Sequence, residues 1–245
     1  EAGTLTIVGD ELHYQGHRYP IAAGTGGSDA AAVHARQHYE LMHWQRADTD
    51  LNYRRFFAIN ELAAVRVEEP DVFQATHHLI LDAVQHGLVD GLRVDHPDGL
   101  RDPAGYLRTL RTAAGGAYTI VEKILEPGES LPADWMTEGT TGYDALTLID
   151  RVLVDSDGVG ALHALEDSLR ATPLDWSDEV HRGKRMIADT ILGSEVSRLV
   201  RDALRDMAAR GIPPRNAPET LHDALAELLT AFPVYRSYLP YGRTS

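Results

Sequence analysis

The sequence predicts an α/β fold in which a parallel sheet lies between a small β-rich start and a helical end. Helical and strand-like patterns alternate between residues 71 and 124, and such alternation is typical of right-handed βαβ units. Gly9-Asp10 separates two short alternating segments near the start, which indicates a β-hairpin. From residue 157 to 232 the pattern is almost wholly helical.

The first part of the chain is predicted to contain a hairpin, a connection, a helix and a strand. The hairpin is expected over residues 4–14, and the Gly-, Ala- and Ser-rich stretch 22–30 is expected to be a flexible connection. A helical pattern covers residues 29–47. Aromatic and β-branched residues within 52–68 then predict a strand followed by a loop.

The central part of the chain supplies the predicted sheet. Helices are expected over residues 71–86 and 104–113, and strands over 88–95 and 117–124. The buried face of the first helix is expected to consist of Val72, Leu79, Ile80, Ala83 and Val84. Because ligands bind at the carboxyl ends of parallel strands, the residues that end the two strands are candidates for a site.

The last part of the chain is predicted to be a helical insertion or subdomain. It follows a Gly- and Thr-rich loop at residues 138–144. One long helix is expected over residues 175–210, and the Gly-Ile-Pro-Pro sequence at 211–214 marks its end.

The composition limits the classes of partner. The sequence has 37 acidic and 23 basic side chains, and its net charge of −14 argues against nucleic acid and membrane surfaces as partners. A neutral substrate such as a sugar fits this charge better. The sequence contains no cysteine, so we expect no disulfide and a cytoplasmic location. Because it starts without Met or a signal-peptide pattern, we expect the true N-terminus to be missing.

Two carboxylates end the predicted strands. Arg93 and Asp95 share one strand face, where the guanidinium can hold the carboxylate ionised as a nucleophile. Glu122 ends the next strand. In glycoside chemistry one carboxylate attacks the sugar and a second protonates the leaving oxygen. A purely structural ion pair of Arg93 with Asp95 is an equally weighted alternative.

Other titratable clusters give weaker signals. His34 and His38 have a spacing that could bind a metal, but no third ligand supports them, and a solvated helix face is the favoured interpretation for them and for His77. The acidic run at 95–102 lacks the ligand pattern of a calcium loop. No dinucleotide-binding, Walker or serine-hydrolase motif is present. We therefore expect neither a metal nor a cofactor.

Two segments resemble signature sequences of the α-amylase clan. GLRVDHPDGLRDPAGYL at 91–107 is similar to the clan's G-x-R-x-D segment, which supplies the nucleophile, and IVEKIL at 120–125 is similar to the strand that supplies the acid/base Glu. Together with EGTTGYD, NYRRFFAINELAAVRVEEPDVF and FPVYRSY, these segments resemble the maltooligosyl trehalose synthase family over nearly the whole chain.

The resemblance implies part of a (β/α)₈ TIM barrel of the α-amylase type, with a small β-containing excursion and a helical insertion. Strand four would end at Asp95, the nucleophile, and strand five at Glu122, the acid and later the base. The implied reaction converts the reducing-end α-1,4 linkage of a maltooligosaccharide into an α,α-1,1 (trehalose) linkage. It proceeds by a retaining two-carboxylate mechanism and needs no cofactor.

The resemblance also implies residues that bind the substrate. They are Arg93, as the ionic partner of the nucleophile, and Tyr53, Arg54, Phe57, Asn60, His96 and Lys123. Barrel packing is an equal alternative for the two aromatic residues, and a surface position is an equal alternative for Lys123. Many α-amylases carry Lys and His three and four residues after the nucleophile, where this sequence has Asp98 and Gly99. This departure fits a mutase with a specialised glucose site.

The implied regions are the tail of an excursion after strand three (1–55), a barrel segment with the catalytic strands (56–154), a helical insertion (155–232) and a return toward the barrel (233–245). In the family, the segments that supply an Asn-His pair and the third carboxylate lie outside this region. We therefore expect a central fragment that is inactive alone. The alternatives are another α-glucan hydrolase or transglycosylase of the clan, and a non-catalytic glucan-binding fragment.

Overall fold

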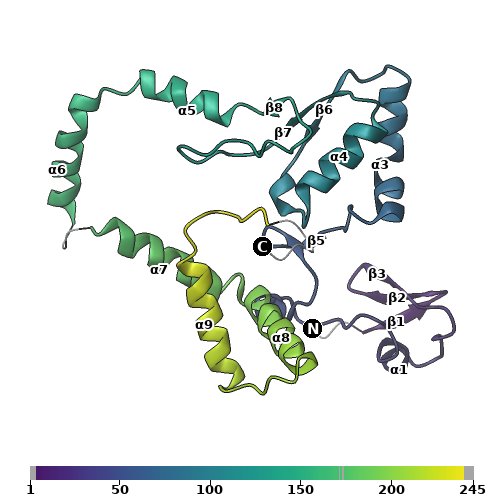
Figure 1. Ribbon diagram of the computed structural model, residues 1–245. Helices are drawn as coiled ribbons and strands as arrows, with labels where there is room; N and C mark the ends of the chain where they lie inside the picture. The colour runs from purple at the N-terminus through teal and green to yellow at the C-terminus, as the bar shows by residue number, and fades with distance from the viewer. Residues whose placement is uncertain (1–3, 171, 173, 240–245) are drawn as a thin grey trace. The chain divides into compact units, whose positions relative to one another are not determined.

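The computed structural model describes residues 4–170, 172 and 174–239 of the 245-residue chain (Figure 1). The chain forms two compact units, which divide between Leu51 and Asn52. Helices and strands occur in both units, so the fold is mixed α/β. None of the helices in the described ranges combines the length and the apolar character needed to span a bilayer.

The first unit contains a three-stranded antiparallel sheet. Its strands β1 (Thr6–Val8), β2 (Glu11–Tyr14) and β3 (His17–Pro20) pair in chain order, so the predicted hairpin is confirmed. The single helix predicted over 29–47 is wrong. The chain instead forms α1 (Ala30–His34), the 3-10 turn η1 (Trp44–Arg46) and α2 (Ala47–Asp50).

Side-chain bonds divert the backbone after α1. The Gln37 amide donates to the carbonyl of Val33 and accepts from the N–H of Ala22. Nε2 of His34 accepts from the N–H of Leu41 over 2.9 Å. Such bonds compete with the backbone bonds of a helix, and they explain why the helical pattern does not continue.

The second unit contains a short antiparallel ribbon and a parallel sheet. The ribbon consists of β4 (Arg55–Phe56) and β5 (Ile59–Ala63). The parallel sheet has the order β6-β7-β8, with β6 (Gly91–Val94), β7 (Tyr118–Val121) and β8 (Gly139–Thr140). Helices α3 (Pro70–Gln85) and α4 (Pro103–Ala113) precede β6 and β7, so the predicted helix–strand alternation is confirmed.

Helix α3 buries a different face from the predicted one. Phe73, His77 and Leu81 are buried, whereas Leu79 and Ile80 are exposed. The rings of Phe73 and His77 stack with centroids 4.1 Å apart. Nε2 of His77 also lies 2.8 Å from the hydroxyl oxygen of Tyr106 on α4. The solvated position expected for His77 is therefore wrong, because contact with α4 selects the inward face of α3.

Gly91 begins β6 at a point where two strands approach closely. A Cβ atom on Gly91 would lie 2.9 Å from the carbonyl oxygen of Tyr118 on β7. The register pairs Gly91 with Tyr118, and Val94 with Val121. A larger residue at position 91 would therefore push β6 away from β7.

The rest of the second unit is helical. It contains α5 (Tyr143–Val152), α6 (Val159–Leu169), α7 (Trp176–Asp189), α8 (Gly193–Ala209) and α9 (Pro218–Thr230), with the 3-10 turn η3 (Ser156–Gly158) between α5 and α6. The single helix predicted over 175–210 is wrong, because Thr190 has φ −119° and ψ −95° and separates α7 from α8. Many apolar side chains of α5 and α6 are exposed, including Leu148 and Leu162.

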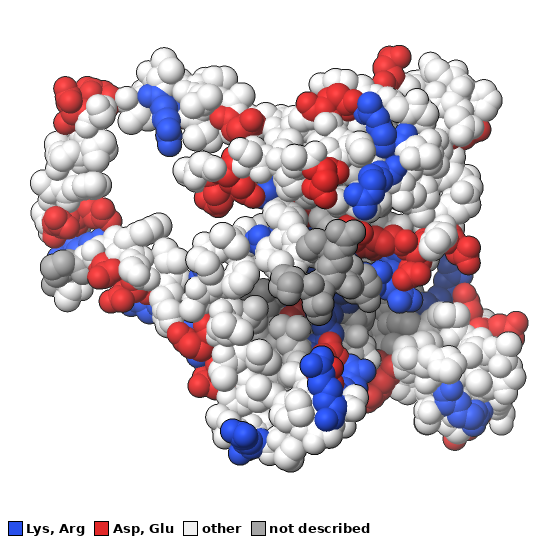
Figure 2. Space-filling view, in the orientation of Figure 1, with Lys and Arg blue, Asp and Glu red and all other residues white. Residues whose placement is uncertain are grey.

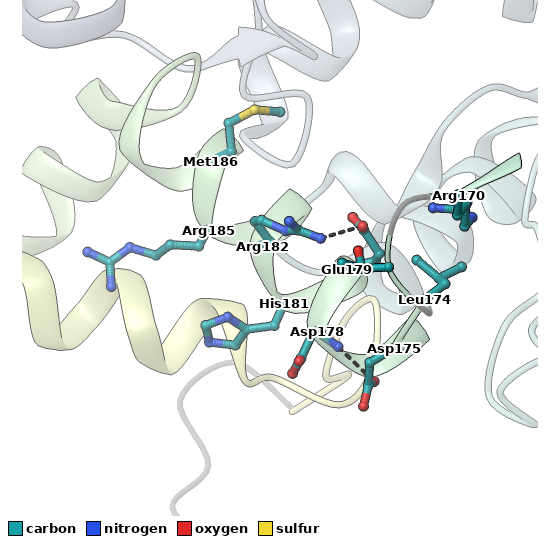
Figure 3. Close-up of a pocket in the computed structure, with 10 residues that line it drawn as sticks. Arg170, Leu174, Asp175, Asp178, Glu179, His181, Arg182, Arg185 and Met186 are labelled. Carbon is teal, nitrogen blue, oxygen red and sulfur yellow. Dashed lines mark hydrogen bonds and ion pairs between the residues drawn. The ribbon is translucent and has the colours of Figure 1, made fainter. Parts of the chain in front are cut away.

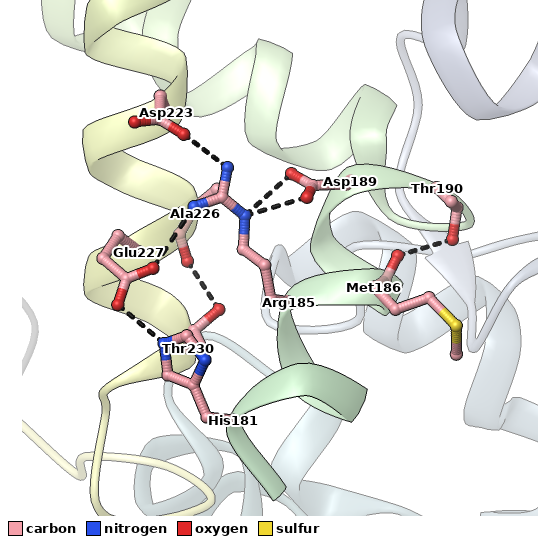
Figure 4. Close-up of polar contacts among 9 residues, drawn as sticks. All are labelled: His181, Arg185, Met186, Asp189, Thr190, Asp223, Ala226, Glu227 and Thr230. Carbon is pink, nitrogen blue, oxygen red and sulfur yellow. Dashed lines mark hydrogen bonds and ion pairs between the residues drawn. The ribbon is translucent and has the colours of Figure 1, made fainter. Parts of the chain in front are cut away.

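Polar contacts join α7 to α9 (Figure 4). Arg185 bonds Asp189 on its own helix and both Asp223 and Glu227 on α9, and His181 lies 2.8 Å from Glu227. Arg185 therefore joins α7 to α9 through two carboxylates of α9. On the face of the molecule shown in Figure 2, acidic and basic side chains also lie near one another.

The buried His77 makes the stability of the chain depend on pH. Burial lowers the pKa of His77 below its usual 6.5 and outweighs the bond to the Phe73 carbonyl, which acts in the opposite direction. The unfolded chain therefore takes up the proton first, and the free energy of unfolding falls as the pH drops below about 6.5. We expect the free energy of unfolding, measured with urea, to fall less on acidification in His77→Gln than in the unchanged chain. The control is His78→Gln, which replaces the exposed neighbour. An equal fall of this free energy in the unchanged chain and both variants would contradict the assignment.

Candidate active site

Asp95 and Glu122 follow neighbouring strands in register. The last register pair of β6 and β7 is Val94 with Val121, and the N–H of Glu122 donates to the carbonyl of Val94 over 2.8 Å. Asp95 and Glu122 therefore come next at the same edge of the sheet, where neighbouring strands are about 4.8 Å apart. The structure places the two predicted carboxylates on adjacent strand ends.

Arg93 and Asp95 form an ion pair that faces solvent. Nη1 of Arg93 donates to Oδ1 of Asp95 over 2.6 Å, and the two side chains are 49% and 59% exposed. Exposed pairs of this kind contribute at most about 1 kcal/mol to stability. The pair therefore adds little to stability, and the carboxylate of Asp95 is accessible to a ligand.

His96 connects the two strand ends through its backbone. Its φ of 44° and ψ of 53° lie in the left-handed region, which costs a residue with a side chain about 1–3 kcal/mol. In this conformation the N–H of His96 donates to Oε2 of Glu122 over 3.1 Å. The strained residue thus orients the carboxylate of Glu122.

Aromatic rings border Asp95. The ring centroids of Phe56 and Phe57 lie 5.6 and 5.2 Å from that of His96. Phe57 is 64% exposed and has a φ of 52°, so the turn of the ribbon presents its ring to solvent. A cavity of about 340 Å³ is lined by Arg54, Phe57, Asp95 and His96, among others. Four of the predicted site residues therefore share a cavity of the size that binds small ligands.

Tyr53 and Asn60 do not line this cavity. The hydroxyl of Tyr53 donates to the carbonyl of Asn60, and Oδ1 of Asn60 accepts from Nη1 of Arg55 over 2.9 Å. Both residues therefore make hydrogen bonds within the ribbon.

Arg55 anchors the ribbon to helix α8. Its buried guanidinium donates to both carboxylate oxygens of Glu195, over 3.1 and 3.0 Å, and to the carbonyl of Ile191 over 2.7 Å. Burial raises the pKa of Glu195, but the bonds from Arg55 and Ser194 outweigh this effect and keep it below its usual value. The sequence shows two adjacent arginines, Arg54 and Arg55, and nothing in their spacing indicates which one is buried.

Lys123 lies inside the fold, so the surface position considered for it is wrong. Its side chain is 1% exposed, and Nζ lies 2.9 Å from Glu129 and 3.5 Å from Asp98. Burial lowers the pKa of Lys123, but Glu129, Asp98 and Tyr238 together outweigh burial and raise it, so the ammonium stays charged. With these partners, Lys123 is not available to bind sugar hydroxyls.

A second cavity, of about 780 Å³, lies beside α7 and contains none of the predicted site residues (Figure 3). Several of its charged groups have local partners. Arg182 pairs with Glu179, and Asp175 accepts from the N–H groups at the start of the helix. These groups stabilise the helix and do not converge on a common point.

The sequence contains one His-Asp dipeptide, His222-Asp223, and it does not end a parallel strand. Both residues belong to α9, where Asp223 bonds Arg185. Within residues 4–170, 172 and 174–239, no group of three His, Cys, Asp or Glu side chains could hold a metal ion.

Comparisons with known proteins give one consistent group of relatives, although no family model matches the chain. A curated relative from Mycobacterium tuberculosis, provisionally named a maltooligosyl trehalose synthase, is 44% identical over 169 residues, which make up 69% of this chain and 22% of the relative. The solved maltooligosyltrehalose synthase of Arthrobacter ramosus is 52% identical, with a TM-score of 0.84 over 97% of this chain and 30% of that one. A hypothetical maltooligosyl trehalose synthase of Sulfolobus tokodaii is 32% identical, with a TM-score of 0.76 over 99% of this chain and 31% of its own.

The mixed α/β fold of this chain is also the fold of the corresponding part of these solved neighbours. More specifically, the chain is homologous to one part of the maltooligosyl trehalose synthases. It spans 22% of the length of the curated relative and 30% of the length of the Arthrobacter ramosus structure.

Removal of the Arg55 anchor should destabilise the chain. Arg55→Met leaves Glu195 partly buried without its main partner, and breaking a buried pair costs about 3 kcal/mol or more. The matched control is Arg182→Met, which breaks an exposed pair with Glu179 and should cost less than about 1 kcal/mol. Urea unfolding measures both values, and similar losses in the two variants would refute the role of Arg55.

Proposed function

We propose that the chain supplies the nucleophile and the acid/base of a maltooligosyl trehalose synthase. The observation that carries this proposal is the register of β6 and β7, which brings Asp95 and Glu122 to one edge of the sheet. Retaining glycoside chemistry requires such a pair of carboxylates. The names of the relatives support a maltooligosaccharide as the substrate.

The proposed reaction has two displacements at one anomeric carbon. The carboxylate of Asp95 attacks C1 of the penultimate glucose unit, while Glu122 gives its proton to the glycosidic oxygen and the reducing-end glucose leaves. Glu122 then takes the proton of the anomeric hydroxyl of that glucose, and the hydroxyl oxygen attacks C1 and displaces Asp95. Two inversions retain the α configuration, so the α-1,4 linkage becomes an α,α-1,1 linkage.

The freed glucose must turn over before water attacks, so the pocket has to hold it and exclude water. The cavity next to Asp95 supports this requirement. Phe57 and His96 offer ring faces for a sugar, and the guanidinium of Arg54 offers donors for its hydroxyls. These three residues are the proposed walls of the glucose site.

The parallel strands are proposed to belong to a (β/α)₈ barrel that the remainder of a longer protein completes. β6 and β8 are the edges of the described sheet, and apolar side chains of α5 are exposed. Closure of a barrel removes open edges and covers apolar faces. Under this proposal residues 1–55 form the excursion, 56–154 the barrel segment, 155–232 the insertion and 233–245 the return.

The chain alone is proposed to be inactive, because it lacks the third carboxylate. The absence of cysteine from the sequence supports a cytoplasmic location.

Replacing either carboxylate tests the assigned roles in the full-length protein. Asp95→Asn should lower turnover of maltopentaose by about 10⁴-fold or more, because no covalent intermediate can form. Glu122→Gln should lose about 10²–10⁴-fold but stay active on maltosyl fluoride, whose leaving group needs no proton. The exposed carboxylate before β6 provides the control, Asp90→Asn, which should behave as the unchanged enzyme. Normal turnover in Asp95→Asn would remove the site assignment.

The products formed from maltopentaose separate the alternative functions. A non-reducing product with an unchanged degree of polymerisation supports the mutase. Shorter reducing sugars would indicate a hydrolase of the same clan, and binding without turnover by the full-length protein would indicate a glucan-binding function. Chromatography with a reducing-end assay distinguishes the three results.

A further inference from the structure

Lys123 is the residue next to Glu122, and it is the largest fully buried side chain in the described part of the structure. Taking an ammonium group out of water is costly unless it is paired and hydrogen-bonded. Nζ of Lys123 has Glu129 at 2.9 Å, the carbonyl of Ile124 at 3.2 Å and Asp98 at 3.5 Å. This buried charge is therefore fully partnered, and its position beside the acid/base calls for an explanation.

Asp98 connects Lys123 to the turn that follows Asp95. It belongs to the 3-10 turn η2 (Pro97–Gly99), and its side chain is 7% exposed. One carboxylate oxygen faces Lys123, and the other accepts from the hydroxyl of Tyr238. Arg236 donates to the backbone carbonyl of Asp98 as well. The turn is therefore held by charged and polar groups from two distant parts of the chain.

The same turn holds the acid/base carboxylate. His96 lies two residues before Asp98, and its N–H donates to Oε2 of Glu122 over 3.1 Å. In a protonated carboxyl group the carbonyl oxygen is a better hydrogen-bond acceptor than the hydroxyl oxygen, so the bond to Oε2 favours a proton on Oε1. The position of the turn therefore biases which oxygen of Glu122 carries the proton.

We propose that Lys123 is a positioning residue for the acid/base step. Its ion pair with Asp98 keeps the turn in place, so that the N–H of His96 meets Glu122 and the proton stays on Oε1. The inference rests on the proposed function, because it assigns Lys123 to the proton transfer from Glu122 to the glycosidic oxygen.

Two substrates, maltopentaose and maltosyl fluoride, test the proposal in the full-length protein. Maltopentaose needs the proton of Glu122 for its leaving group, whereas maltosyl fluoride loses fluoride when Asp95 attacks C1 and needs no proton. Lys123→Met should lower kcat on maltopentaose by about 10²-fold with KM changed less than about threefold, and lower fluoride release by less than about threefold. Asp98→Asn should show the same selectivity, and it carries the test if Lys123→Met does not fold.

The other lysine of the sequence provides a matched control. Lys184 lies on α7 and donates to the carbonyl of Phe232, so Lys184→Met should leave the ratio of the two rates unchanged. If Lys123→Met and Asp98→Asn lowered the rates on both substrates equally, the role of Lys123 would be purely structural and the proposal would be overturned. Unchanged rates on both substrates would also overturn it. Failure of the proposed function is a separate result, in which the unchanged enzyme forms no trehalose-terminated product.

Discussion

The hydrogen bond from the N–H of Glu122 to the carbonyl of Val94 is the contact on which the candidate site depends. It extends the parallel pairing of β6 and β7 one residue beyond the strands, so that the two carboxylates keep a fixed relation. A shift of the register by one residue would turn each side chain to the other face of the sheet. The apolar cluster that includes Leu107, Leu110 and Val121 holds the strands against α4 and prevents such a shift.

Buried ion pairs support the candidate site, and the carboxylate of Asp95 stays open to solvent. Arg55 ties the aromatic ribbon to Glu195, and Lys123 ties the turn after Asp95 to Glu129. These pairs are rigid because burial makes their separation costly. Asp95, in contrast, is more than half exposed. The fold thus places buried ion pairs beside the candidate site and leaves the carboxylate of Asp95 accessible.

Features with a local signal could be predicted from the sequence. The strand that ends at Asp95 and the hairpin at Gly9-Asp10 follow from alternation and turn residues a few positions apart. The burial of Arg55 could not be predicted, because it requires Glu195, which lies 140 positions later in the chain. The buried face of α3 depends in the same way on Tyr106, and the position of Lys123 depends on Asp98 and Glu129.

The close approach at Gly91 links a position without a side chain to the geometry of the candidate site. A methyl group there would act as a wedge between two strands, and Asp95 lies four residues further on, about 13 Å along an extended strand. Such a wedge would spread the strand ends apart although Asp95 and Glu122 remained in the sequence. The spacing of the backbone is therefore as much a part of the candidate site as the two carboxylates are.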